Sequence, residues 1–175
     1  MALLARIATL VVAFYFVLAP QVAASGTDEY RVKLAFLFNF AKFVEWPEAD
    51  DELCVGVLGE DPFGPSLERT LLGKNVRGAR LSIARSNSAA DLVDCDIVFV
   101  TDPSASPEAI LAAFGDRPIL TVGDDLEFAE AGGVAGFFVE RGKVRFAISP
   151  EAAQKAGLSV SSQLLGLAKI VGEMP

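Results

Sequence analysis

The chain contains no histidine, and this absence excludes more chemistry than any other feature of its composition. Without an imidazole there is no Ser-His-Asp or Cys-His nucleophile, no histidine general base and no histidine-ligated metal. Basic residues are also scarce, with 15 Lys and Arg against 23 Asp and Glu and a net charge of −8. That balance argues against nucleic acid as the main partner. We therefore expect an acidic protein of 175 residues that is not an enzyme and carries no cofactor.

A short apolar run lies near the N-terminus. Ile7–Leu18 spans twelve residues, follows the positive charge of Arg6 and precedes the small residues at 22–24. This order is typical of a secretory signal peptide. A membrane anchor is the alternative, but a bilayer requires roughly 20 apolar residues. We predict a signal peptide over residues 1–24 and one exported domain over residues 25–175.

Only two cysteines are present, Cys54 and Cys95, which lie 41 positions apart. Disulfides persist in the oxidising compartments that exported proteins reach, whereas two lone thiols without histidine make a poor metal site. Two reduced, buried thiols are the alternative. In a doubly wound sheet of order 2-1-3-4, the strands that start near these residues are neighbours and begin at the same edge. We predict a Cys54–Cys95 disulfide and no metal site.

Short apolar runs alternate with helical segments along the rest of the chain. The predicted strands are Leu53–Leu58, Leu81–Arg85, Ile97–Val100, Pro118–Val122, Val134–Glu140 and Lys143–Ile148. The predicted helices are Asp28–Trp46, Pro65–Leu72, Pro107–Phe114, Leu126–Ala131, Pro150–Ala156 and Ser161–Val171. Such alternation implies parallel βαβ units, and the two-residue link between the last two strands indicates a hairpin. We predict an α/β three-layer sandwich with a mostly parallel, doubly wound sheet and a C-terminal antiparallel hairpin.

Four acidic residues directly follow predicted strands, namely Glu60, Asp61, Asp124 and Asp125. Ligands of doubly wound sheets bind beyond the carboxyl ends of the strands, so these residues are a candidate ligand edge for a cation or a basic molecule. The alternative is local structure, in which Asp125 caps the next helix and Asp61 begins a turn. The sequence favours the local alternative.

Two further motifs carry weaker signals. Asp91, Asp94 and Asp96 are the residue types that bind divalent metals, but they precede a strand and are expected at the opposite edge, in a solvated loop. Gly157–Ser161 approaches the GxSxG nucleophile elbow but ends in serine, and no histidine exists to activate Ser159. We expect a helix cap there and no catalytic residue.

The predicted first helix is apolar on more than one face. Leu34, Leu37 and Ala41 lie on one stripe, and Phe36, Phe40 and Phe43 form a second. An amphipathic surface helix needs only one apolar stripe. The second stripe either packs inside the molecule or forms a contact with a partner, since exposed aromatic patches usually mark interfaces. The candidate interface residues are Phe36, Phe40, Phe43, Leu164 and Leu165.

The chain also resembles a known family. Residues 30–47 resemble the opening signature of the YfiR-like periplasmic proteins through Lys33, Phe36, Asn39, Phe40, Phe43, Glu45, Trp46 and Pro47. The resemblance continues in the expected order through residues 58–64, 95–99, 119–124 and 157–165.

This resemblance implies a periplasmic regulator without enzymatic activity. Such proteins bind the periplasmic sensor part of an inner-membrane diguanylate cyclase and repress it, which lowers cyclic-di-GMP and biofilm formation. The resemblance also implies a homodimer and matches Cys54 and Cys95 to a recurrent disulfide of the family. The second cysteine pair of some members is missing here. The partner is either such a cyclase or another membrane sensor. A small-ligand-binding module that reports to a sensor kinase or transporter is the alternative function.

Overall fold

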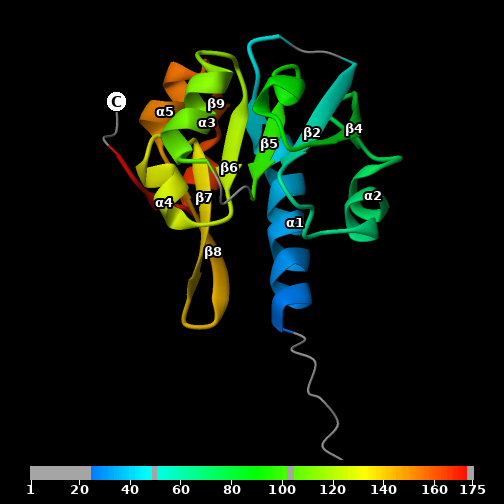
Figure 1. Cartoon of the computed structure of the whole chain (residues 1–175), viewed down its shortest axis with the longest axis horizontal. Helices are drawn as coiled ribbons and strands as arrows, with labels where there is room; N and C mark the ends of the chain where they lie inside the picture. The colour runs from blue at the N-terminus through cyan, green and yellow to red at the C-terminus, as the bar shows by residue number, and fades with distance from the viewer. Residues whose placement is uncertain (1–24, 49–50, 102–104, 173–175) are drawn as a thin grey trace, which may run out of the picture.

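The computed structural model describes residues 25–48, 51–101 and 105–172 (Figure 1). The predicted signal peptide lies outside the described residues. The helices are α1 (Ser25–Phe43), α2 (Pro65–Leu71), η1 (Ala89–Leu92, a 3-10 helix), α3 (Pro107–Phe114), α4 (Leu126–Glu130), α5 (Pro150–Lys155) and α6 (Ser162–Leu165). The strands are β1 (Val44–Glu45), β2 (Glu52–Leu58), β3 (Asn75–Val76), β4 (Ala79–Ser86), β5 (Ile97–Val100), β6 (Leu120–Gly123), β7 (Ala135–Glu140), β8 (Lys143–Ile148), β9 (Ser159–Val160) and β10 (Lys169–Ile170).

The main sheet has eight strands in the order β10-β8-β7-β6-β5-β2-β4-β3. Strands β4, β2, β5, β6 and β7 run parallel, which confirms the predicted 2-1-3-4 order of the first four long strands. Strands β7 and β8 form the predicted antiparallel hairpin. Its two-residue turn places Arg141 at φ 51° and Gly142 at φ 72°, the left-handed conformation that tight hairpins require.

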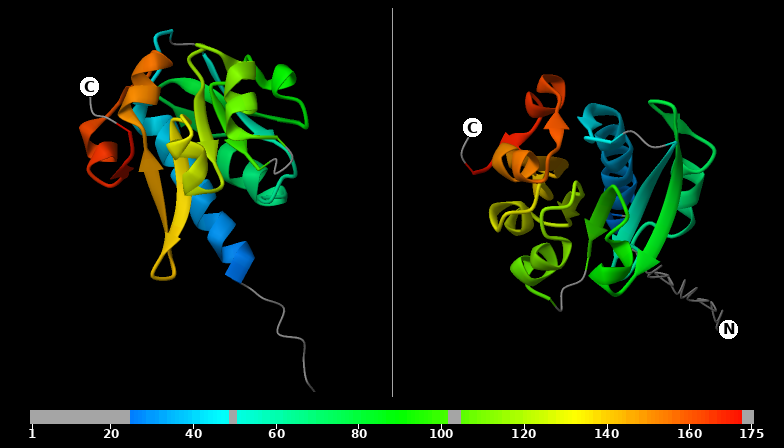
Figure 2. Two further views of the ribbon diagram at one scale, coloured as in Figure 1. Left: turned by 60° about the vertical axis from the view of Figure 1, so that its left-hand side comes forward. Right: turned by 90° about the horizontal axis from the view of Figure 1, so that it is seen from above.

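Helices cover both faces of the sheet and complete the predicted three-layer α/β sandwich (Figure 2). One core lies between the sheet and helices α1, α2, α5 and α6. A second lies between the other face and η1, α3 and α4. The central strands β5 and β6 are buried along their whole length. Strands covered on both faces read as continuous apolar runs, which is why the sequence showed them clearly.

Two expectations about the helices are wrong at their C-terminal ends. Helix α1 ends at Phe43, and β1 follows it and pairs with β9 in a separate two-stranded sheet. Pro47 disfavours helix at the residue before it, so the chain turns extended early. The predicted helix Ser161–Val171 is only the single turn α6, followed by β10, which pairs in parallel with the otherwise open edge of β8.

Candidate functional site

The predicted disulfide is present. Cys54 in β2 is bonded to Cys95, which stands two residues before the neighbouring strand β5, and their Cα atoms are 4.6 Å apart. The Asp96 carboxylate accepts a hydrogen bond of 2.7 Å from the Cys54 backbone N–H. The Trp46 indole N–H donates to the Asp96 carbonyl at 3.2 Å. These contacts join the start of both strands, and the disulfide fits an oxidising compartment.

Two of the four acidic residues at the carboxyl edge serve local structure. Asp125 accepts a hydrogen bond of 2.9 Å from the Phe128 N–H and caps α4. Asp61 accepts one of 2.7 Å from the Phe63 N–H and also pairs with Arg85 at 2.8 Å. Glu60 is exposed. The cap and the turn are the local alternative that the sequence favoured. In the described part of the chain, no cluster of acidic or cysteine side chains is arranged to hold a metal ion.

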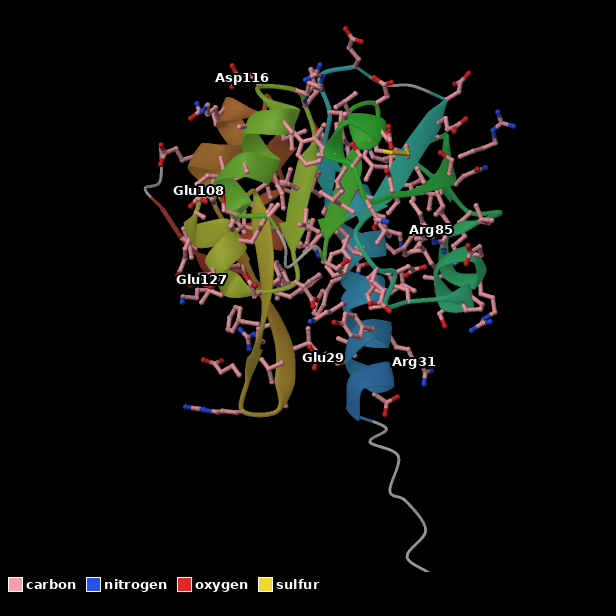
Figure 3. The ribbon with its side chains drawn as sticks, in the orientation of Figure 1. Glu29, Arg31, Arg85, Glu108, Asp116 and Glu127 are labelled. Carbon is pink, nitrogen blue, oxygen red and sulfur yellow. A yellow bond between two sulfur atoms is a disulfide. The ribbon has the colours of Figure 1, made fainter. Side chains whose placement is uncertain are left out.

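The fourth acidic residue, Asp124, anchors helix α1 to the end of β6. One carboxylate oxygen lies 2.7 Å from the Lys33 ammonium nitrogen, and the other accepts a hydrogen bond of 2.7 Å from the Tyr30 hydroxyl. Lys33 also pairs with Glu29 at 2.7 Å, and its side chain is only 3% exposed. Glu29 lies on the side of α1 that faces the β7–β8 hairpin, with Arg31 on the opposite side (Figure 3). Both oxygens of Asp124 are therefore engaged within the fold.

Aromatic rings surround the Lys33 ammonium, and burial affects the Tyr30 hydroxyl. The Lys33 nitrogen lies 4.8 Å from the centre of the Tyr30 ring and 5.8 Å from that of Phe137, so aromatic faces help to stabilise the ammonium. Burial, followed by the hydrogen bond to Asp124, raises the pKa of Tyr30 far above its ordinary value. The phenol consequently stays protonated and donates. These contacts hold α1 in place against the end of β6.

Lys33 and Tyr30 are the residues that sequence reasoning missed as partners of Asp124. A signal for Lys33 was present, because it occupies the same helical stripe as the buried Leu37 and Phe40. A charged residue on a core-facing stripe requires a partner of opposite charge. The sequence alone does not show which of the 23 acidic residues supplies it.

The aromatic stripe of α1 lies largely inside the molecule. Phe40 is 1% exposed, and its ring centre lies 6.0 Å from that of Phe137 and 5.1 Å from that of Phe146. Leu164 is 3% exposed. Phe40 and Leu164 therefore follow the alternative of packing inside the molecule: the rings of Phe137 and Phe146 cover Phe40, and Leu164 of α6 joins the same core. The other candidates are partly buried against the same core, namely Phe36, Phe43 and Leu165.

An apolar groove lies instead between α1 and the β7–β8 hairpin, both of which extend beyond the rest of the fold in the same direction (Figure 1). Val32 is 43% exposed and Val139 is 55% exposed, and both line this groove of about 580 Å³. Its rim carries Glu29 on the helix and Lys143 on the hairpin. The groove is a candidate contact surface, since clustered exposed apolar side chains usually mark interaction sites.

A smaller cavity of about 390 Å³ lies at the carboxyl ends of β5 and β6. Thr101, Ile110 and Phe128 line it, together with the acidic residues Asp124 and Asp125. Doubly wound folds bind ligands at this edge. Asp124 is paired to Lys33, and the exposed Glu127 adds a further carboxylate to a lining that mixes polar and apolar residues.

Solved structures share this architecture. A conserved domain protein from Vibrio cholerae O1 biovar El Tor is 13% identical over 79% of this chain and 60% of that one, with a TM-score of 0.56. The ABC domain in complex with L-Trp from Streptococcus pneumoniae is 11% identical over 85% of this chain and 60% of that one, with a TM-score of 0.53. The chain thus spans about 60% of the length of each structure. These similarities show the fold alone.

The strand order and the two helical layers define a small α/β protein with a mostly parallel, doubly wound sheet. Residues 30–169 match the YfiR/HmsC-like family, and the chain belongs to that family. No curated protein matches it. The family is periplasmic and generally non-catalytic, which supports a regulatory role with a protein partner. Among the described residues, no helix combines the length and apolarity that crossing a bilayer requires.

Proposed function

We propose that this protein, after loss of its signal peptide, binds the periplasmic sensor part of an inner-membrane diguanylate cyclase as a homodimer and represses it. Cyclic-di-GMP and biofilm formation then fall. The observation that carries this proposal is the family match over residues 30–169. The disulfide of Cys54 with Cys95 supports export, since such bonds persist in oxidising compartments.

The surface that we assign to the cyclase is the groove between α1 and the hairpin. Val32 and Val139 are two of the five exposed large apolar residues among those described, and they share this groove. Repression requires that the protein bind the inactive form of the cyclase more tightly than the active form. A tenfold difference in affinity corresponds to about 1.4 kcal/mol, which a few buried apolar side chains supply.

Deletion of the gene tests the proposal. Cyclic-di-GMP should rise in the deletion strain, fall again when the full chain is supplied, and stay high when a chain without residues 1–24 is supplied. Val139→Asp should fail to restore repression. Leu167→Asp, a matched change at a residue that is 62% exposed outside the groove, should restore it. Unchanged cyclic-di-GMP after deletion would remove the link to a cyclase.

A second candidate function is binding of a small ligand that is reported to a membrane sensor kinase or transporter. The cavity at the ends of β5 and β6 favours it, as does the likeness to a Streptococcus pneumoniae domain in complex with L-Trp. Thermal-shift measurements with amino acids, vitamins and divalent cations test it. A stabilisation that disappears in Glu127→Ala, at the exposed rim of the cavity, would support this function. Stabilisation by none of these compounds would contradict it.

A further inference from the structure

Strand β4 has a strand partner along only part of one side. Strand β2 pairs with β4 from Arg80 to Ser86. On the other side, β3 reaches only Ala79 and Arg80. A hydrogen bond from the Leu81 N–H to the Lys74 carbonyl follows, at 3.4 Å. Within the described residues, no strand pairs with this side of β4 beyond Leu81.

The outward-facing backbone groups of β4 follow from the parallel pairing. The Arg80 N–H donates to Asp51, and the Ser86 carbonyl accepts from Gly59, so even-numbered residues point their backbone groups toward β2. Alternate residues of a parallel strand bond to opposite sides. Ile83 and Arg85 therefore direct their N–H and C=O groups toward the open side.

The segment that forms this edge is rich in basic residues, although the whole chain is acidic. Residues 69–90 contain five of the 15 basic residues and none of the 23 acidic ones. All five are exposed, namely Arg69, Lys74, Arg77, Arg80 and Arg85. Arg77 pairs with Glu45, and Arg85 pairs with Asp61 and Glu68. The other three form no ion pair within the described residues. We call these five residues and the open side of β4 the basic edge.

We propose that the basic edge binds an extended acidic segment of a partner protein, which adds to the sheet as a strand beside β4. A second strand can pair with the free N–H and C=O groups of an edge strand along its length. A lipid headgroup or a free anion does not supply this row of alternating donors and acceptors. The basic edge of a second copy is excluded because like charges would face each other. This contact lies away from the groove assigned to the cyclase. The proposal of a strand beside β4 is therefore tested independently of that assignment.

Hydrogen exchange of the free protein tests the open edge. The amides of Ile83 and Arg85 should exchange quickly, while those of Ser82 and Ala84 should exchange slowly because they bond to β2. The even-numbered residues are internal controls in the same strand. Slow exchange at Ile83 and Arg85 in the free protein would overturn the proposal, because the edge would already be covered.

A synthetic peptide tests the partner. The probe is an end-blocked peptide that alternates glutamate and valine, compared with one that alternates lysine and valine. The glutamate peptide should slow exchange at Ile83 and Arg85 by about tenfold or more at millimolar concentration, with less protection as salt rises. No protection by the glutamate peptide, or equal protection by the lysine peptide, would overturn the proposal.

A charge-reversal variant tests the role of the basic residues. Combined Lys74→Glu and Arg80→Glu should weaken binding of the glutamate peptide by about tenfold or more. Lys155→Glu, an exposed change on α5, should leave binding intact. Matching thermal unfolding curves would show that each variant is folded. Unchanged binding in a folded double variant would overturn the proposal, and Arg69→Glu repeats the test if the double variant unfolds.

Discussion

The Lys33 ammonium nitrogen lies 2.7 Å from a carboxylate oxygen of Asp124, a residue 91 positions later in the chain. This ion pair joins the first half of α1 to the carboxyl end of β6. Lys33 is nearly inaccessible, whereas the Asp124 side chain is 29% exposed. The helix is thereby fixed at the edge where related folds bind ligands, and both carboxylate oxygens of Asp124 are occupied by the protein itself.

Removal of Lys33 should destabilise the fold. Lys33→Ala leaves Asp124 and Glu29 without their shared cation; because both carboxylates are partly exposed, the cost should lie below the roughly 3–5 kcal/mol of a fully buried pair. Urea unfolding followed by Trp46 fluorescence measures the change. Lys33→Met combined with Asp124→Asn should cost less than the two single changes added together, because neither partner is left alone. Additive costs would show that the pair is not coupled.

The pH dependence of stability should change at high pH because of Tyr30. Tyr30 is the single tyrosine of residues 25–175, so tyrosinate absorbance reports on it alone. Its pKa is raised above the ordinary value of 10.0, so the folded state retains a proton that the unfolded state loses. This stabilisation is complete below pH 10 and declines as pH rises above it, by up to about 1.4 kcal/mol per pH unit.

The folded protein should therefore show no tyrosinate absorbance at pH 10 to 11, whereas the urea-unfolded protein should titrate near about 10. Tyr30→Phe should remove this part of the loss of stability at high pH. Titration of the folded protein at the ordinary tyrosine pKa would show that the hydroxyl is not held by Asp124.

Loss of the disulfide should lower the free energy of unfolding. A closed loop with a sequence separation of 41 residues contributes about 4 kcal/mol on the chain-entropy model. Cys54→Ser combined with Cys95→Ser should lose about this amount in urea unfolding at neutral pH. Mass spectrometry of the exported protein should show two fewer hydrogens before reduction. Two free thiols in that protein would contradict the structure.

Gly136→Ala should lower the stability of the fold. The added Cβ would collide with the Asp125 carbonyl and press on Ala129, where α4 packs closely on β7. Such overpacking typically costs about 1–3 kcal/mol. Gly26→Ala, where nothing lies within 4 Å of the new Cβ, is the matched control and should not destabilise. Equal thermal unfolding temperatures for both variants would contradict this packing.

The strand order was predictable because the buried parallel strands are apolar along their length and the cysteine spacing agreed with the order. Asp125 and Asp61 follow the local rules of helix capping and turns, so their roles could also be predicted from the sequence. The partners of Asp124 could not, since a contact over 91 positions leaves no local pattern.

The C-terminal end shows a different limit of sequence reasoning. Leu164, Leu165 and Leu167 suggested a helix, but the open edge of β8 takes residues 169–170 as a strand. Whether these residues form a helix or pair with β8 depends on tertiary structure, which a local pattern of apolar residues does not predict. In the same way, the stripe containing Phe40 gave no sign that the hairpin would cover it and leave Val32 and Val139 exposed.

The central claim is repression of a cyclase by direct contact, and its most direct test is enzymatic turnover. Purified residues 25–175 would be added to each full-length membrane diguanylate cyclase of the same organism in detergent, and cyclic-di-GMP production from GTP would be measured. Turnover of one cyclase should fall to a low plateau as the protein is added, and Val139→Asp should leave it high. Unchanged turnover of every cyclase at saturating protein would contradict the account.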